Sequence, residues 1–362
     1  MIKKGGADDG DSQELAAYTN LSIATISRIL NNDPTMVASE DTRRRVLEAA
    51  GALGYKKHNK GKVSAVLRFG VAEMLTPAEQ LEDPFYLYLK NFVAQECMEQ
   101  KIDLIPLLRD GESFTCPYPL PLNGIIAIGI FTRAQIEALH QLSDTLVFVD
   151  SSPDEARSDS VVINYRLGIE HALDHLFSLG HRQIGFVGPA DKLDDWKQPA
   201  PEVRRQLFIH FMSARNDYDS SFLIDVPTNA ALTERAVTEH LRQGKPLPTA
   251  FLTANEENAI GTVRALKAAG LSIPQDVSII SFNDTPLSEL MEPPLTSIST
   301  RVQEMSSIAV HLLTERSSST GYLRDIPVKL IVPPTLVVRA STAAPPVGSA
   351  SDDMIEMQDD FS

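Results

Sequence analysis

Polar side chains suited to binding a small molecule follow three of the apolar runs that the sequence predicts to be β-strands. They are Asp150 after residues 146–149, Asn255 after residues 250–253 and Asn283 after residues 278–282. Ligands of open α/β sheets bind beyond the carboxyl ends of the strands, so we expect these side chains to form one site. Arg204, at the start of a predicted helix after residues 188–201, belongs with them. Carboxylates, amides and an arginine suit paired hydroxyl groups such as those of a sugar.

Two aromatic residues, Phe85 and Trp196, are candidates for the apolar surface that a sugar ring needs. Each of these six residues also has a simpler interpretation, as a helix cap or as part of a solvated loop. The sequence alone leaves both interpretations open.

No catalytic motif stands out. The chain has no phosphate-binding loop and no G-x-G-x-x-G, H-E-x-x-H or G-x-S-x-G pattern. No pair of carboxylates is marked by its surroundings as an acid–base couple. His171 and His175 would share one face of a helix, with His181 nearby, but no third ligand has convincing spacing for a metal. We therefore expect neither an enzyme nor a bound metal or cofactor.

The N-terminal region combines short polar side chains with basic charge. Residues 12–62 contain eight Lys/Arg and five Asp/Glu, although the whole chain has a net charge of −15. Residues 12–55 read as three short helices, with a tight connection at residues 19–21 and Ser22 as the N-cap of the second helix. This pattern is typical of a helix-turn-helix that contacts DNA. An ordinary solvated helical face would have a similar composition.

The remaining composition indicates a cytoplasmic protein. No stretch approaches the roughly 20 apolar residues that a membrane crossing needs, and the N-terminus lacks the apolar segment of a signal peptide. Cys97 and Cys116 are the two cysteines, which suggests reduced thiols rather than a disulfide framework.

From about residue 66, short apolar runs alternate with helical stretches, which favours parallel sheets covered on both faces. The number of runs indicates two doubly wound halves. We predict a disordered N-terminus at residues 1–11, an all-α headpiece at 12–56, a basic linker at 57–65, an α/β core at 66–341 and a disordered acidic tail at 342–362. The first subdomain of the core is expected at about 66–164 and 295–325, and the second at about 165–294 and 326–341.

Several segments carry a resemblance to a known family. In the N-terminal region they are LSIATISRILN (21–31), TRRRVL (42–47) and LGY (53–55); in the core they are LGHRQIGF (179–186), ANE (254–256), GLSIPQDVS (270–278), PLTSI (294–298) and LVVR (336–339). In this order they resemble the lactose/galactose repressor (LacI/GalR) family of transcriptional regulators. The resemblance covers roughly residues 13–341.

The resemblance implies a dimer that binds double-stranded operator DNA through its headpieces. Short polar residues of the second helix have the right chemistry for phosphate oxygens: Ser22, Thr25, Ser27 and Asn31. Arg28 can donate two hydrogen bonds to guanine, and Ile23 and Ala24 match the family's base-reading positions. Lys57 and Lys60 in the linker would attract phosphates. The alternative is that Ile23 is a core residue and the Ser/Thr positions are ordinary surface.

The resemblance also implies a periplasmic-binding-protein-like core, with a ligand between two subdomains joined by three crossovers. The positions of Asp150, Arg204, Asn255 and Asn283 match ligand-contacting positions of the family. Asn283, however, stands where an acidic residue is common, and Glu256 stands where aspartate is usual. Because of these two departures, the resemblance does not identify which sugar this protein binds.

The linker departs from the family pattern as well. The family usually has a short helix there, whose leucine wedges into the minor groove, whereas residues 57–62 contain no Leu or Ala and include a Gly. We predict a homodimeric repressor controlled by a mono- or disaccharide, since one short headpiece makes few contacts and residues 343–362 lack a leucine heptad for tetramerisation. The alternative is a cytoplasmic sugar sensor with impaired or no operator binding.

Overall fold

The computed structural model describes residues 66–346, except 77–78, 80–83, 119–120, 318–323 and 325, and twelve residues nearer the N-terminus. Those twelve are Ala16, Tyr18, Thr19, Leu21, Ser22, Thr25, Ile26, Ile29, Thr42, Arg45, Val46 and Ala49. The chain divides into two compact units, residues 1–65 and 66–362. The predicted disordered segment 1–11 and the whole predicted linker (57–65) lie outside the described residues.

The N-terminal unit has a small apolar core of its own. Four buried residues form it, with Ala16 and Leu21 packed against them: Ile26, Ile29, Val46 and Ala49. The backbone N–H of Thr25 donates to Ser22 Oγ at 3.1 Å, which is the N-cap geometry that the sequence predicts for Ser22. Arg45 donates to the backbone oxygen of Thr19 at 3.0 Å. Segments far apart in this sequence stretch are thereby held together.

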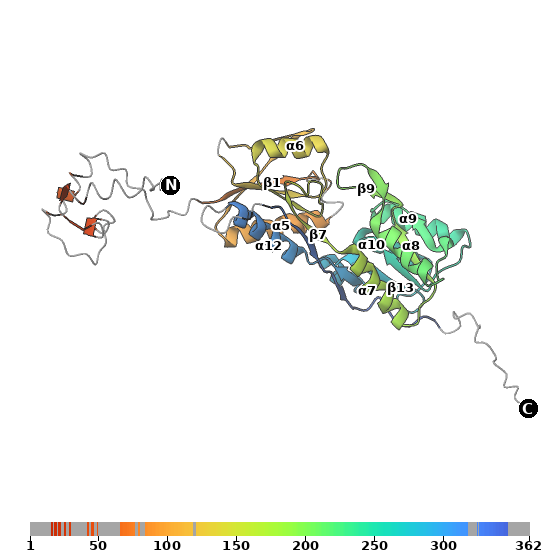
Figure 1. Cartoon of the computed structure of the whole chain (residues 1–362). Coiled ribbons are helices and arrows are strands. Elements are labelled where there is room, and N and C mark those ends of the chain that lie inside the picture. Colours follow the sequence, from red (N-terminus) through yellow and green to blue (C-terminus); the bar gives the residue numbers. More distant parts are fainter. Residues whose placement is uncertain are drawn as a thin grey trace, which may run out of the picture. The chain divides into compact units, whose positions relative to one another are not determined.

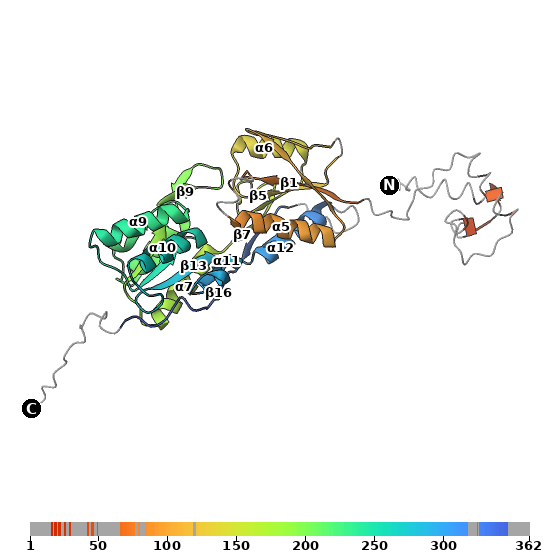
Figure 2. The ribbon, with the colours of Figure 1, turned by 180° about the vertical axis from the view of Figure 1, so that it is seen from behind.

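Six parallel strands form the first sheet of the core, in the order β15-β7-β6-β5-β1-β2. They are β1 (Arg68–Glu73), β2 (Asp103–Pro106), β5 (Gly124–Ile128), β6 (Leu146–Val149), β7 (Asp159–Ile163) and β15 (Lys329–Val332). The central strands β5 and β6 are apolar and buried along their whole length, as a sheet covered on both faces requires. Helices α5 (Pro84–Glu99) and α12 (Val302–Ser317) cover one face, and α6 (Arg133–Leu142) covers the other (Figure 2). We call this part the first lobe.

The second sheet has the order β11-β8-β12-β13-β14-β16, in which only β16 is antiparallel to its neighbour. Its strands are β8 (Ile184–Gly188), β11 (Leu223–Asp225), β12 (Ala250–Thr253), β13 (Ser278–Asn283), β14 (Thr296–Ser299) and β16 (Thr335–Val337). Helices α7 (Tyr165–Ser178) and α8 (Val203–Ala214) pack on one face, and α9 (Ala230–Arg242) and α10 (Glu256–Ala268) on the other. This is the second lobe (Figure 1).

Shorter elements complete the core. A 3₁₀ turn (Ser220–Phe222) precedes β11, and the short helix α11 (Pro286–Leu290) follows β13. Two antiparallel ribbons lie outside the sheets: β3 (Leu108–Asp110) with β4 (Ser113–Thr115), and β9 (Asp191–Leu193) with β10 (Pro199–Pro201). In both views the β9–β10 hairpin lies on the side of the second lobe that faces the first lobe (Figures 1 and 2).

The chain passes between the lobes after β7, after β14 and after β15. The predicted subdomain boundaries are wrong at the last two passages. Residues 296–299 were expected in the first subdomain, but they pair with β13 of the second sheet. Residues 329–332 were expected in the second subdomain, but they pair with β7 of the first sheet. Each of these strands pairs with an edge strand whose backbone groups still need partners. The sequence of the added strand does not specify which sheet offers that edge.

Helices α9 and α10 approach each other closely at Gly261. A Cβ atom on Gly261 would lie 2.3 Å from the backbone oxygen of Ala230 and 2.6 Å from the Cβ of Thr233. A side chain at this position is therefore incompatible with the observed packing of the two helices.

The segment that follows β16 belongs to the second lobe, contrary to the predicted start of a disordered tail at residue 342. His181 Nε2 lies 2.8 Å from the Ala343 backbone oxygen, and His175 Nε2 lies 3.0 Å from Thr342 Oγ1. The buried Ser341 hydroxyl donates to the Ile279 backbone oxygen at 2.6 Å. Among the described residues, no helix is long and apolar enough to cross a membrane.

Candidate functional site

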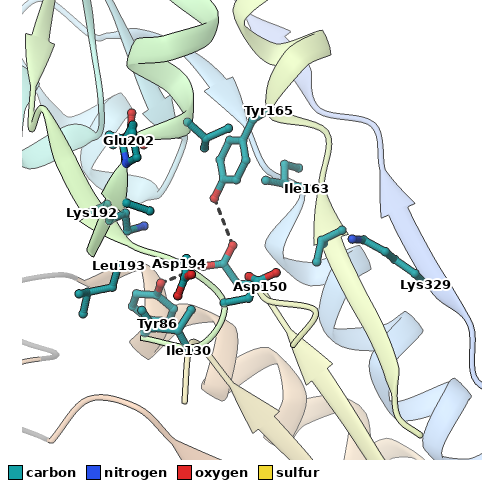
Figure 3. Close-up of a pocket in the computed structure, with 15 residues that line it drawn as sticks. Tyr86, Ile130, Asp150, Ile163, Tyr165, Lys192, Leu193, Asp194, Glu202 and Lys329 are labelled. Atoms are coloured by element: carbon teal, nitrogen blue, oxygen red, sulfur yellow. Dashed lines mark hydrogen bonds between the residues drawn. The ribbon is translucent and has the colours of Figure 1, made fainter. Parts of the chain in front are cut away.

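A cavity of about 420 Å³ lies between the two lobes at the carboxyl ends of their strands. The first lobe contributes Tyr86, Ile130, Asp150, Val162, Ile163 and Lys329; the second contributes Tyr165, Lys192, Leu193, Asp194, Asp195, Ala200, Pro201, Glu202 and Val203. Figure 3 shows the main side chains of this lining. The position agrees with the rule for ligands of open α/β sheets, and the volume falls within the range of small-molecule sites, about 300–1,000 Å³.

Asp150 is the central polar group of this first cavity. It directly follows β6 and has a left-handed backbone, with φ +70°, which is uncommon for a residue other than glycine and occurs preferentially at functional sites. Tyr86 of α5 donates to Asp150 Oδ2 at 2.8 Å, and Tyr165 of α7 donates to Asp150 Oδ1 at 3.2 Å (Figure 3). Two tyrosines from different elements therefore fix the carboxylate, while its remaining lone pairs stay available for hydroxyl donors.

Tyr165 links Asp150 to a buried ion pair. Desolvation of its hydroxyl raises the pKa of Tyr165 well above 10, and the negative charge of Asp150 raises it further. The phenol therefore stays protonated and keeps donating its hydrogen bond. The guanidinium of Arg204 lies 5.5 Å from the centroid of the Tyr165 ring, within the range of a cation–π contact.

Arg204 and Glu202 form the ion pair behind the tyrosine. Arg204 Nε donates to Glu202 Oε1 at 2.7 Å, and the guanidinium also donates to the backbone oxygen of Ala254. Burial raises the pKa of Glu202, but the charge and hydrogen bonds of Arg204 and the N–H of Arg205 lower it more, so the net pKa is below its usual value. Glu202 is thus ionised, and it also caps α8 by accepting from Arg205 N at 2.8 Å.

The structure separates the six predicted ligand residues. Asp150 lines the first cavity, and Trp196 lines a neighbouring cavity. Phe85 is buried in the core of the first lobe, with its ring centroid 5.1 Å from that of Tyr86. Arg204 lies behind Tyr165 and is 4% exposed. Direct contact of Phe85 and Arg204 with a ligand stays a prediction; in this structure both support lining residues.

Asn255 and Asn283 are both buried at the carboxyl ends of their strands. The Asn255 side chain accepts from Asn258 N at 3.0 Å and so acts as the N-cap of α10, which is the alternative that the sequence left open. Asn283 has φ +93°, and its backbone oxygen accepts from Thr300 Oγ1 at 3.3 Å. Neither residue belongs to the lining of the first cavity, and their ligand contact also stays a prediction.

Glu256 does not cap its own helix. Its Oε1 accepts from Thr285 N at 2.6 Å and from Ser288 Oγ at 2.8 Å, so this side chain anchors α11 instead. Burial raises the pKa of Glu256 to about 7, against these hydrogen bonds, which lower it. Glu256 therefore lies in a structural contact between α10 and α11.

The histidines considered as metal ligands have structural contacts. His181 Nδ1 lies 2.8 Å from Thr249 Oγ1, and its other ring nitrogen faces Ala343, as described above. Burial lowers the pKa of both His175 and His181. Among the described residues, no group of three or more His, Cys, Asp or Glu side chains is arranged to hold a metal ion.

Of the predicted DNA-binding residues, the structure describes Ser22 and Thr25, whose hydroxyl oxygens lie 2.8 Å apart. The other predicted contacts lie outside the described residues: Ile23, Ala24, Ser27, Arg28, Asn31, Lys57 and Lys60. Ser22 is exposed, and its contact with DNA stays a prediction.

Comparison with known proteins identifies the family. Residues 13–58 match the description "Bacterial regulatory proteins, lacI family", and residues 173–342 match a periplasmic binding protein-like domain. The HTH-type transcriptional repressor MelR of Bacillus subtilis (strain 168) is 32% identical over 343 residues, covering 91% of this chain and 96% of MelR. The chain belongs to the LacI family.

Two solved LacI-type structures share the fold. A complex of the transcriptional regulator CelR with cellobiose has a TM-score of 0.61 at 21% identity, covering 91% of this chain and 99% of CelR. The Lac repressor dimer bound to operator and an anti-inducer has a TM-score of 0.62 at 22% identity, covering 91% of this chain and 98% of that repressor. They confirm the predicted fold class, a helix-turn-helix headpiece with a periplasmic-binding-protein-like core.

Membership of the LacI family leaves individual site residues to be found from the geometry. Tyr86, Tyr165 and Glu202 line the cavity, and sequence reasoning did not select them. Tyr165 comes two residues after strand β7, so the rule that selected Asp150 applies to it as well. Tyr86 directly follows the selected Phe85, and the helical turn of α5 directs Tyr86, not Phe85, to Asp150.

Proposed function

We propose that this LacI-family protein is a sequence-specific transcriptional repressor whose operator binding is controlled by a sugar held between the two lobes of its core. The observation that carries the proposal is the first cavity, in which side chains from both lobes surround the tyrosine-bound carboxylate of Asp150. MelR, similar along almost its whole length, is named a transcriptional repressor.

The chemistry of the cavity favours a polyhydroxylated, uncharged ligand. Carboxylates can accept hydrogen bonds from neighbouring hydroxyls, and Ile130, Ile163 and Leu193 offer apolar surface beside them. Arg204 is paired with Glu202, and four carboxylates line the cavity against two lysines, which argues against an anionic ligand such as a phosphate. The cellobiose of the CelR complex makes sugars the first class to test.

The control mechanism follows from the two-lobed site. Asp150, Tyr86 and Lys329 belong to one lobe and Glu202, Lys192 and Tyr165 to the other, so a ligand touching both favours one relative placement of the lobes. A ligand shifts an equilibrium only by its difference in affinity for the two states. We infer that sugar binding changes the lobes of a dimer and thereby the spacing of its two headpieces. Operator affinity would change with that spacing.

The assembly and location follow from the same proposal. We expect a cytoplasmic homodimer, since two headpieces are needed to read a two-fold symmetric operator. A tetrameric mass in solution would contradict the dimer. Relatives such as MelR are regulators, and we expect no catalysis from this chain.

Fluorescence anisotropy tests the repressor function. The purified protein is titrated against labelled DNA from upstream of its own gene and against scrambled DNA, at two salt concentrations and with or without sugars. We expect tighter, salt-sensitive binding to the natural DNA and a change in affinity with one sugar. Equal, weak binding to both DNAs together with sugar binding would instead support the sugar sensor without operator binding, which the unusual linker (residues 57–62) suggests.

A further inference from the structure

A second cavity lies beside the first, at the tip of the β9–β10 hairpin. It has a volume of about 440 Å³ and is lined by Ser152, Pro153, Glu155, Asp194, Asp195 and Trp196. Asp194 and Asp195 line both cavities. The two cavities therefore adjoin at these two residues.

The second cavity also has one wall from each lobe. The indole N–H of Trp196 in the hairpin donates to the backbone oxygen of Pro153 in the first lobe at 2.8 Å. The guanidinium of Arg133, on α6, lies 4.8 Å from the centroid of the Trp196 ring. Burial raises the pKa of Asp195 in the hairpin, and the backbone N–H of Ser152 in the first lobe lowers it in part. The hairpin thus bridges the gap between the lobes next to the first cavity.

The chemistry of the second cavity repeats that of the first. Glu155 and Asp195 provide carboxylate acceptors, and Trp196, which is 40% exposed, provides aromatic surface. Lys329 of the first cavity lies 2.8 Å from Glu155 Oε1 of the second. Since each volume alone lies within the range of small-molecule sites, about 300–1,000 Å³, each can hold one small polar unit.

We propose that the effector has at least two sugar rings, one in the Asp150 cavity and the next in the Trp196 cavity. This inference rests on the proposed sugar effector and specifies its class as an oligosaccharide. Trp196 then determines specificity, because it covers the second ring while Glu155 and Asp195 accept hydrogen bonds from its hydroxyls. The Asp150 cavity contributes affinity for the first ring alone.

Isothermal titration calorimetry of the full-length protein tests this inference with glucose, galactose and the α- and β-linked disaccharides of these hexoses. We expect one disaccharide to bind at least about tenfold more tightly than either of its monosaccharides. Trp196→Ala should remove most of this advantage, because the affinity for the disaccharide should fall by a larger factor than the affinity for the monosaccharide. Glu155→Gln, which keeps the size of the side chain, should reduce the affinity for the disaccharide more than the affinity for the monosaccharide, which also changes because Lys329 of the first cavity loses its ion-pair partner.

Tyr118→Ala is the matched control. Tyr118 is an aromatic residue of the first lobe, 57% exposed, and it belongs to neither cavity lining. The variant should bind every sugar as the unchanged protein does. Far-UV circular dichroism checks that all variants fold.

The possible results separate the two proposals. Equal affinities for a monosaccharide and its disaccharide would overturn the two-ring inference while leaving the sugar effector intact. An equal loss of both affinities in Trp196→Ala would also overturn it, because Trp196 would then only hold the lobes together. Binding of none of these sugars would refute the proposed sugar effector itself, and the two-ring inference with it.

Discussion

Removal of the Glu202 carboxylate should leave Arg204 as an unpaired buried cation. The side chains of Glu202 and Arg204 are 0% and 5% exposed, and their charged atoms lie 2.7 Å apart. Breaking a buried ion pair by removing one partner costs about 3–5 kcal/mol, because the other charge stays buried without compensation. We therefore expect Glu202→Gln to lower the free energy of unfolding by at least about 3 kcal/mol. Glu202→Ala should lose about 1 kcal/mol more, since it also removes the N-cap of α8.

Urea unfolding followed by far-UV circular dichroism measures this loss. The double variant Glu202→Gln with Arg204→Met should be more stable than Glu202→Gln alone, because no buried charge then remains. Asp174→Ala is the control: Asp174 pairs with Arg215, but the two side chains are 66% and 51% exposed. Its loss should stay below about 1 kcal/mol.

The pH dependence supplies an independent check. The pKa of Glu202 in the folded protein is lowered, so its stabilisation is present above the unfolded pKa and is lost as pH falls through the folded pKa. The stability difference between the unchanged protein and Glu202→Gln should therefore be constant near neutrality and shrink in acid. A loss of less than about 1 kcal/mol at neutral pH would refute the argument that Glu202 neutralises Arg204.

Three further predictions concern other contacts of the core. Tyr165→Phe removes one donor to Asp150 and should weaken sugar binding about tenfold in calorimetry, with an unchanged affinity as the contrary result. The folded pKa of Glu256 is raised from 4.5 to about 7, so its favourable contribution exists below the unfolded pKa and is lost as pH rises through 7. The Glu256→Gln variant should therefore be as stable as the unchanged protein near pH 4 and more stable than it by up to about 3 kcal/mol at pH 8. Equal stabilities of the two proteins at both pH values would contradict this reasoning. A Gly-to-Ala change in an exposed helix stabilises it by about 0.5–1 kcal/mol. At Gly261, however, the new Cβ would lie 2.3 Å from the Ala230 oxygen, so we expect Gly261→Ala to lower the melting temperature. A higher melting temperature would show that α9 and α10 can move apart to accept the side chain.

Local patterns were sufficient to predict the layers of the core. Strands such as β5 and β6 are short apolar runs without alternation, and both are buried on two faces, as the parallel-sheet interpretation required. The assignment of the last strands failed, because β14 and β15 are each four residues long and can pair with an edge of either sheet. Such a short strand pairs with whichever sheet edge lies next to it in the folded protein, and its own sequence does not specify which edge that is.

In the candidate site, too, some residues could be predicted from the sequence and others could not. The strand-end rule selected Asp150, which lines the first cavity, because the carboxyl end of a parallel strand has a fixed place in the fold. The same rule could not tell a cap from a ligand contact at Asn255, since both use a polar side chain at the same position. For Arg204 the sequence did not reveal Glu202, two residues earlier, as the partner that occupies its guanidinium.

The β9–β10 hairpin was not predicted as a structured element. Residues 188–201 read as a loop, and β10 contains two prolines, Pro199 and Pro201, which donate no backbone hydrogen bonds. Prolines fit a two-stranded ribbon, because the outer edge of each strand has no neighbouring strand to which backbone N–H groups must donate. The placement of Trp196 at the second cavity depends on this ribbon and could not follow from its sequence position.

The exchange of strands between the lobes affects how the protein is completed on the ribosome. The first sheet acquires its edge strand from residues 329–332 and the second from residues 335–337, although most of both lobes precedes residue 300. During synthesis, neither sheet can be finished until this last stretch emerges, so the usual order of N-terminal domain first does not apply within the core. A product truncated before residue 329 would expose the edges of β7 and β14, which can pair with other chains. Premature termination late in the gene should therefore yield aggregating polypeptides and not a shortened sensor.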